Sequence, residues 1–281
     1  MIKEKFLVLL LGIQIIIAVY YLPVSIDNLQ RLLEGNFIDN LGFLIGTISR
    51  YGFTIIGGIG LVKYLQDKDI NNTYLRLCYF FFAIEFILSA PATLMIYLRF
   101  DLTTNFMFFF FNILATIKLI LTVLVYGTQL KTVQFEKKAT ASIRLSHHFV
   151  DSLALTLLAL QLRESYQFLL GIGILSEFYL VYFFSRFFYY LIAESIFQQT
   201  FGKMITKHYV TQMDGGKASF GQILKRSLVR MIPFEAVSLL AQPWMGWHDS
   251  LSDTNVYPLS EQREVAMEDY LLDHLVEKEA L

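Results

Sequence analysis

The stretch Arg144-Leu145-Ser146-His147-His148-Phe149-Val150-Asp151 places a basic residue and an acidic residue seven positions apart at the start of a long apolar run. In an α-helix this spacing brings both residues to one face, about 10 Å apart along the axis. We therefore expect a membrane helix over 145–162, with Arg144 at its mouth and Asp151 about two turns inside it. A long arginine side chain directed inward could then approach the carboxylate.

The composition of the whole chain is that of a membrane protein. Of its 281 residues, 55% are hydrophobic and 16% are aromatic, and the mean hydropathy is +0.51. Ordinary soluble domains contain far less apolar sequence. The formal net charge of −1 hides a segregation, because the last 24 residues carry seven acids against two bases. We expect the lipid bilayer as the main partner, and no nucleic acid.

Six apolar segments have about the length needed to cross a bilayer. They cover residues 6–22, 41–65, 77–98, 105–130, 145–162 and 168–197. A shorter run, 231–242, spans, re-enters or lies on the membrane, and the sequence leaves these alternatives open. Asp214-Gly215-Gly216 lies between two short β-prone pieces and predicts a hairpin. The predicted fold class is all-α, a polytopic transmembrane helical bundle of about six spans plus one interfacial or re-entrant helix, with a small cytoplasmic β-hairpin.

The distribution of lysine and arginine predicts the orientation of this bundle. If the amino terminus is cytoplasmic, fifteen of these residues fall on the inner side and three on the outer side, namely Arg31, Arg99 and Arg163. Short loops rich in lysine and arginine stay on the cytoplasmic side. We therefore expect both termini in the cytoplasm.

Several charged residues fall inside the predicted spans. Each costs about 2.5 to 3.5 kcal/mol at the centre of a bilayer, so these residues should face other helices and find partners. We expect Arg50, Glu85 and Lys118 to form an intramembrane charge cluster in which Glu85 pairs with one of the two bases. Such a cluster either lines a polar path or only fixes the register of the helices. Glu177 and Arg186 are further candidates in the last span.

The second half of the chain contains a series of short motifs in a fixed order. They are Arg144 with Asp151, Thr200-Phe201-Gly202-Lys203, Ser219-Phe220-Gly221, Leu228-Val229-Arg230, Pro233-Phe234-Glu235, and Trp247-His248-Asp249 followed by Thr254 and Val256. Together, over residues 144–258, these motifs resemble the RDD family of bacterial membrane proteins. The family is named for one arginine and two aspartates. Arg144 and Asp151 match the first two, and the third acidic position appears here as Glu235, which keeps the charge on a longer side chain.

The resemblance and the composition together divide the chain into three parts. Residues 1–140 form an N-terminal four-helix transmembrane region that ends in a basic linker, and this part lies outside the resemblance. Residues 141–258 form an RDD-like membrane domain, and 259–281 form an acidic cytoplasmic tail helix. The resemblance implies a multi-pass protein of the bacterial cytoplasmic (inner) membrane.

Two functions remain open. Some RDD-like proteins resemble sodium–proton antiporters in behaviour, which implies cation/proton transport. Asp151 and Glu235 suit this chemistry, because burial raises the pKa of a carboxyl group while a bound cation lowers it. His248 and Asp249 are candidates for a proton relay or for a local hydrogen bond. The alternative is a non-transporting membrane scaffold or assembly partner, in which these residues hold the polar segments together and the acidic tail docks a protein partner.

Enzymatic chemistry is not expected. The chain contains no Ser/His/Asp, zinc-binding or phosphate-binding arrangement with the required spacing. The single cysteine, Cys78, allows neither an intramolecular disulfide nor a cysteine-based metal site. We therefore predict no cofactor and no metal.

Overall fold

The computed structural model describes residues 2–34, 37–99, 106–127, 139–170, 174–232, 235, 238 and 246–258. These residues are mostly helical. The six long helices are α1 (Ile2–Glu34), α2 (Phe37–Asp67), α3 (Thr73–Arg99), α4 (Phe106–Tyr126), α5 (Ala141–Leu170) and α6 (Ile174–Phe197). The shorter elements are α7 (Phe201–Ile205), β1 (His208–Gln212), α8 (Phe220–Val229), α9 (Trp247–Leu251) and β2 (Thr254–Pro258). The predicted tail helix 259–281 and most of the run 231–242 lie outside the described residues, as does the side chain of Glu177.

Four described helical segments are long and apolar enough to cross a membrane. They are Ile2–Asp27, Leu41–Asp67, Thr73–Leu94 and Phe178–Ile205, and Asn112–Tyr126 forms a shorter apolar helix. Large apolar side chains on these helices point away from the protein; Ile16 is 71% exposed and Ile55 is 65% exposed. An extended apolar surface of this kind is stable in lipid and unfavourable in water. The helices are therefore consistent with a membrane protein.

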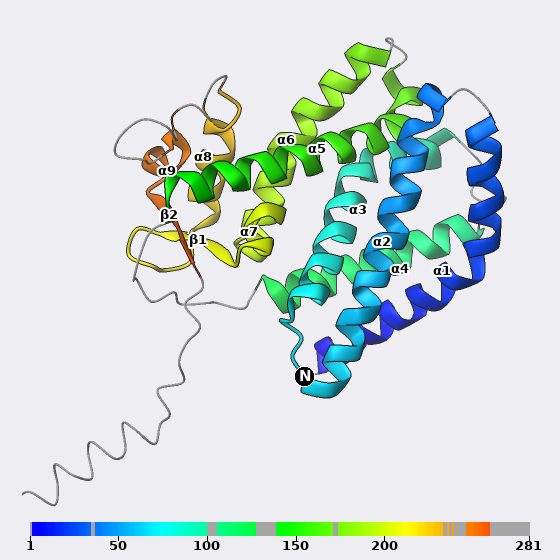
Figure 1. Ribbon diagram of the computed structural model, residues 1–281, viewed down its shortest axis with the longest axis horizontal. Coiled ribbons are helices and arrows are strands. Elements are labelled where there is room, and N and C mark those ends of the chain that lie inside the picture. The colour runs from blue at the N-terminus through cyan, green and yellow to red at the C-terminus, as the bar shows by residue number, and fades with distance from the viewer. Residues whose placement is uncertain are drawn as a thin grey trace, which may run out of the picture.

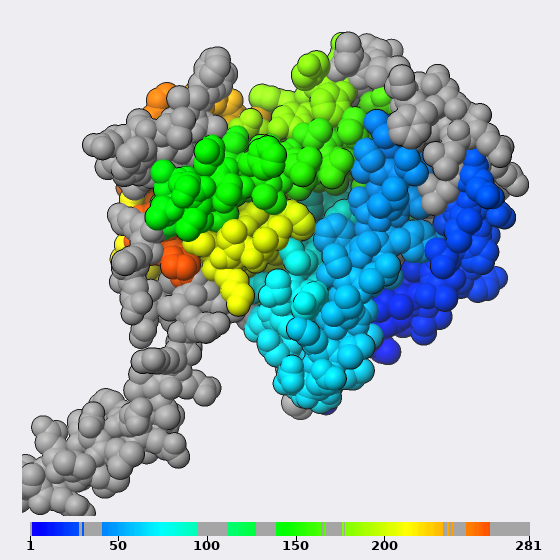
Figure 2. Space-filling model, viewed as in Figure 1, coloured from blue at the N-terminus to red at the C-terminus, as the bar shows by residue number. Residues whose placement is uncertain are grey.

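The long helices and the short elements occupy opposite ends of the molecule (Figure 1). Helix α5 runs across the view and packs against α2, α3, α6 and α7. At its amino-terminal end lie α7, β1, α8, α9 and β2, which we call the carboxy-terminal lobe (described residues 201–232 and 246–258). In the space-filling view, α7 (yellow) fills the space between α5 (green) and α3 (cyan) (Figure 2). The lobe thus contacts the bundle through α5, α6 and α3.

Two apolar clusters, together with the buried pair Tyr209 and Tyr257 on the two strands, hold these parts together. The larger one joins α1, α3, α5 and α6 through buried side chains that include Leu11, Leu75, Leu155 and Phe197. It therefore runs across the boundary predicted at residue 140. The smaller cluster lies in the lobe and joins the two strands to α8 and the residues before α5; its members are Ala139, Val210, Ala218, Ile223 and Val256. The lobe has few apolar contacts of its own, so polar contacts must contribute to its position.

The predicted hairpin is corrected by the strand pairing. The turn at Asp214-Gly215-Gly216 forms as expected, since Gly215 adopts a φ of 86° and Gln212 N donates to Gly216 O at 2.8 Å. The residues after the turn add only one bridge, Thr211 to Lys217. Helix α8 begins at Phe220 and leaves no room for a second strand. Strand β1 instead pairs antiparallel with β2, a remote segment, with Val210 opposite Val256.

Candidate functional site

Five elements bring their polar side chains to one buried place between the bundle and the lobe. The first three turns of α5 contribute Arg144 and Asp151, and the last turn of α6 contributes Glu194. Helices α7, α8 and α9 contribute Lys203, Arg226 and Asp249, while Arg230 caps the end of α8 and Glu235 lies between α8 and α9. The cations of this ionic cluster are Arg144, Lys203, Arg226 and Arg230, and its acids are Asp151, Glu194, Glu235 and Asp249. None of the eight residues is more than 5% exposed.

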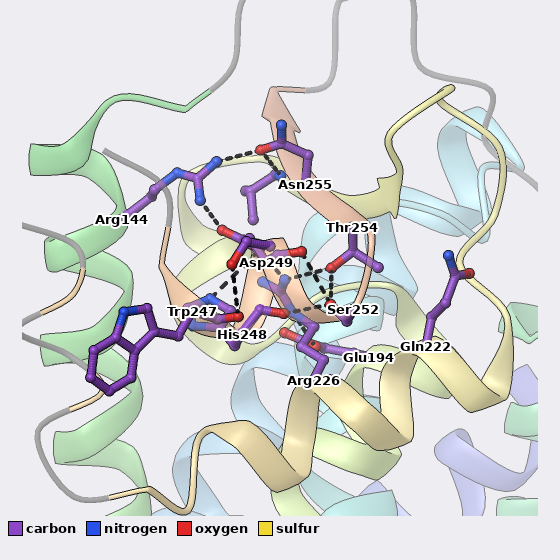
Figure 3. Close-up of polar contacts among 12 residues, drawn as sticks. Arg144, Glu194, Gln222, Arg226, Trp247, His248, Asp249, Ser252, Thr254 and Asn255 are labelled. Carbon is purple, nitrogen blue, oxygen red and sulfur yellow. Dashed lines mark hydrogen bonds and ion pairs between the residues drawn. The ribbon is translucent and has the colours of Figure 1, made fainter. Parts of the chain in front are cut away.

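Asp249 lies at the centre of one half of the cluster, between two arginines (Figure 3). Arg144 on α5 donates from Nη1 to Asp249 Oδ2, and Arg226 on α8 donates from Nη1 to Asp249 Oδ1. Arg144 also donates to the side-chain oxygen of Asn255 and, from Nε, to Ala139 O at 3.0 Å. The carboxylate of α9 therefore ties α5 to α8. Arg144 does not approach Asp151 as its spacing suggested, because Asp249 takes its guanidinium group.

Glu194 lies at the centre of the other half. Its Oε2 accepts from Arg226 Nε at 2.9 Å, and its Oε1 accepts from Arg230 Nη1 at 2.9 Å and from Lys203 Nζ at 3.1 Å. Arg226 and Arg230 are four residues apart, so both project from the same face of α8. A capping box at Ser219 fixes the start of this helix. One carboxylate of α6 thus binds cations from both α7 and α8.

Glu235 and Asp151 have partners of a different kind. His248 Nδ1 is hydrogen-bonded to Glu235 Oε1. Asp151 Oδ1 accepts from the Tyr189 hydroxyl at 2.8 Å and from the backbone N–H of Gly202 at 2.8 Å. The Gly202 contact satisfies a free N–H at the start of α7. The described hydrogen-bond partners of Asp151 are therefore neutral.

Gly202 permits the close approach that this contact requires. A Cβ atom at this position would lie 2.8 Å from the backbone oxygen of His147 and 3.3 Å from Asp151 Oδ1. Only a glycine fits there without displacing the backbone of α5. The short helix α7 is thereby held directly against the part of α5 that carries Arg144 and Asp151.

The contribution of the cluster to stability depends on every buried charge having a partner. Four cations and four acids balance in formal charge, and they are removed from water by an environment in which each unpaired ion would cost several kcal/mol. Removing one member of a buried ion pair typically costs about 3 to 5 kcal/mol, because the remaining charge is left uncompensated. The cluster therefore favours the arrangement in which α5, α6, α7, α8 and α9 meet.

Burial and mutual charge set the protonation of the lobe. Burial lowers the pKa of Arg226 to about 9, and Glu194 acts in the opposite direction. Burial also lowers the pKa of Arg144 to about 10. Both guanidinium groups therefore stay charged at neutral pH. Burial, followed by the charges of Arg226 and Arg230, holds the pKa of His248 well below its usual value, so this imidazole is neutral and pairs with Glu235 by a hydrogen bond.

A cavity of about 30 Å³ lies within the ionic cluster. All four cations line it, together with Asp151 and Glu235. His147, His148 and His248 complete much of the remaining polar wall. Within the described ranges, no group of three or more His, Cys, Asp or Glu residues is arranged to hold a metal ion.

The charges predicted inside the membrane separate into two groups. Arg50 Nε contacts Glu85 Oε1 at 2.7 Å, and Gln161 Nε2 on α5 donates to the same oxygen at 2.6 Å. Gly46 on α2 makes room for Gln161, since a Cβ there would lie 2.9 Å from it. Lys118 instead donates to the side-chain oxygen of Gln14 on α1. The expected pair of Glu85 and Arg50 thus forms, and Lys118 has a different partner.

Sequence reasoning located the site but missed part of its membership. Arg144, Asp151, Glu235, His248 and Asp249 were all predicted, and the structure brings all five to the ionic cluster. Arg186 is half-buried on α6 and acts electrostatically on His148 at the wall of the cavity. The missed residues are Glu194, Lys203, Arg226 and Arg230. Two signals were available: Lys203 and Arg230 stand in the motifs of the resemblance, and Arg226 and Arg230 are four residues apart on an amphipathic segment. Glu194 had only its place in an apolar run.

The fold and the site together define a class, that of helical proteins with membrane-length helices and a buried ionic cluster at one end of the bundle. No family model, no curated protein and no solved structure matches the chain.

Proposed function

We propose that this chain is a multi-pass membrane protein of the RDD type that acts as a non-transporting scaffold. The observation that carries this proposal is that each of the four acids in the ionic cluster already accepts a hydrogen bond from a donor within the chain. A transported cation would have to displace these donors, and it would do so beside four buried cations. The cluster is better suited to fixing the lobe on the bundle, and the acidic tail 259–281 is then the element that docks a partner.

The proposed topology has six spans, with both termini in the cytoplasm of a bacterium and the lobe on the inner side of its cytoplasmic membrane. Helices α4 and α5 are added to the four long apolar helices as further spans. The excess of lysine and arginine on the proposed inner side supports this orientation. Because Cys78 is the single cysteine of the chain, the substitution Cys78→Ala alone gives a cysteine-free background.

Cysteine labelling tests the topology. In that background, Asp214→Cys places a thiol in the exposed turn of the lobe, and Asp27→Cys places one at the exposed far end of the first span. An impermeant maleimide added to intact cells should label Asp27→Cys. It should leave Asp214→Cys unlabelled until the membrane is permeabilised. Labelling of Asp214→Cys in intact cells contradicts the proposed orientation.

Cation–proton exchange is the second candidate, and one observation favours it. The described hydrogen-bond partners of Asp151 are neutral donors, and Asp151 lines the cavity. A carboxylate without a directly bonded cation is the member of the cluster best able to exchange a proton for a metal ion. Glu235, which pairs with a neutral imidazole, is the next candidate.

Sodium flux in proteoliposomes separates the two functions. The parent protein is compared with Asp151→Asn and Glu235→Gln under an imposed pH gradient, and protein-free liposomes set the background. The scaffold proposal expects background flux in all three proteins. A pH-dependent sodium flux in the parent that disappears in Asp151→Asn would refute it and establish exchange. Correct folding of each variant is checked by the fluorescence of the two tryptophans, Trp244 and Trp247.

A further inference from the structure

The cavity within the ionic cluster presents more positive than negative charge to its interior. Its lining contains four cations but only two acids, Asp151 and Glu235. The other two acids, Glu194 and Asp249, balance the charge of the cluster but do not line the cavity. They contact the guanidinium groups from outside the cavity wall. Among the residues that line the cavity, the four cations therefore outnumber the acids by two.

Arg226 supplies a second, independent indication of a ligand. Its side chain is fully buried, it lines the cavity, and its Nη2 has no hydrogen-bond partner in the described part of the chain. Buried side-chain donors are nearly always paired, so an unpaired guanidinium N–H group calls for an acceptor. The other two nitrogens of this group are used by Glu194, Asp249 and Thr254. An acceptor atom inside the cavity would give Nη2 of Arg226 the hydrogen-bond partner that it lacks.

His248 experiences the same field. It is hydrogen-bonded to Glu235 and lies 3.6 Å from Asp249 Oδ1, two contacts that would favour a charged imidazole. The pKa of His248 nevertheless lies well below its usual value. Burial lowers it most, and the charges of four cations lower it further: Arg226, Arg230, Lys203 and Arg144. The part of this shift that the four cations cause indicates that they outweigh the acids at His248, and this part favours an anion at the wall of the cavity.

We propose that this cavity binds the phosphoryl group of a small oxyanion, with Arg226, Arg230 and Lys203 as its donors. Guanidinium groups match phosphate oxygens in geometry, and charge-assisted hydrogen bonds of this kind are about twice as strong as neutral ones. A volume of about 30 Å³ is enough for about two water molecules, which limits the bound part of the ligand to one small group. The phosphoryl group belongs either to free phosphate or to a lipid headgroup. The site does not depend on the scaffold proposal, because an anion bound by the lobe is compatible with either candidate function.

Titration calorimetry of the purified full-length chain in detergent tests the site, with inorganic phosphate added to a buffer free of other oxyanions. The parent should bind one phosphate saturably. Arg230→Gln removes a donor and should weaken binding by at least about tenfold, equivalent to about 1.4 kcal/mol. Lys225→Gln is the matched control, because Lys225 is exposed on the same helix, and it should bind as the parent does.

Because Arg230→Gln also breaks the contact with Glu194, a second variant keeps the test decisive. His148 lines the cavity but takes no part in the ion pairs described above, so His148→Trp should fill the cavity without removing any ion pair. This variant should fold and lose phosphate binding. Equal affinity in the parent and in His148→Trp overturns the proposed site.

A second experiment distinguishes a lipid headgroup from free phosphate as the source of the phosphoryl group. The same proteins in nanodiscs of phosphatidylcholine are compared with nanodiscs that contain phosphatidic acid, and retention of that lipid through purification is measured by mass spectrometry. Retention by the parent and loss in His148→Trp identify a lipid headgroup. Phosphate binding without such retention identifies free phosphate. The absence of both from the parent overturns the proposal.

Discussion

Asp249→Asn is expected to destabilise the carboxy-terminal lobe by about 3 to 5 kcal/mol, the usual cost of removing one partner from a buried ion pair. Asp249 is fully buried and bonded to both Arg144 and Arg226. The amide keeps the shape of the carboxylate but removes the acidic partner of Arg144 and leaves Arg226 with Glu194 alone, and neither guanidinium group is more than 5% exposed. Urea unfolding in detergent, followed by tryptophan fluorescence, measures the change, because both tryptophans of the chain, Trp244 and Trp247, precede or begin α9.

The matched control is Asp253→Asn. Asp253 is an exposed acid just beyond α9, and its φ of 53° suits asparagine as well as aspartate. This variant should stay within about 0.5 kcal/mol of the parent, as surface substitutions usually do. If Asp249→Asn unfolds at the same urea concentration as Asp253→Asn, the carboxylate of Asp249 does not hold the lobe and the reasoning from its two ion pairs is refuted.

Two further predictions concern α7 and the pH response. Gly202→Ala should lower the unfolding free energy by about 1 to 3 kcal/mol, since its Cβ would collide with the backbone of α5. Gly221→Ala is the control: its Cβ would meet open space, so this variant should leave stability unchanged or raise it. A thermal melt that shows the two variants to be equal contradicts this close approach. The folded-state pKa of His248 lies below the unfolded value of about 6.5, so the unfolded chain binds one more proton than the folded chain below that pH. Stability should therefore fall as the pH falls from about 7 to about 5.5, and this residue should contribute about 1.4 kcal/mol per pH unit below pH 6.5. Urea titrations at several pH values should show a correspondingly smaller slope for His248→Gln, and an unchanged slope would mean that His248 is not buried in its neutral form.

The sequence was sufficient to predict the helical architecture because apolar length is a local property. The segments that begin at residues 6, 41, 77 and 168 each overlap a helix of membrane length in the structure, whereas the segment 105–130 holds a shorter apolar helix, Asn112–Tyr126. Helix α5 was also predicted, although its polar residues keep it out of the set of helices that are apolar enough to cross a membrane. The one strand error has a local cause as well: the turn at Gly215 was predicted correctly, but the start of α8 at Phe220 prevents the second strand of a hairpin.

The candidate site was only partly predictable, because its pairing depends on contacts between remote segments. Arg144 and Asp151 share a face of α5, yet Arg144 bonds Asp249, which is 105 positions away in the chain. Asp151 bonds an N–H of α7, a contact that depends on Gly202. Glu194 binds three cations from two other helices, and no local pattern distinguishes it from a charge that merely ends an apolar helix. Spacing along the chain indicated candidate residues of the site, and only the fold identifies the partners of each one.

The claim that the ionic cluster fixes the lobe on the bundle is tested most directly by hydrogen–deuterium exchange of Glu194→Gln. This substitution removes the charge that binds α7 and α8 to α6. Peptides from 220–229 and 254–258 should lose protection together, while peptides from α2 and α3 should keep theirs, because their packing rests on the apolar cluster. Unchanged protection of both lobe peptides in Glu194→Gln would contradict the account.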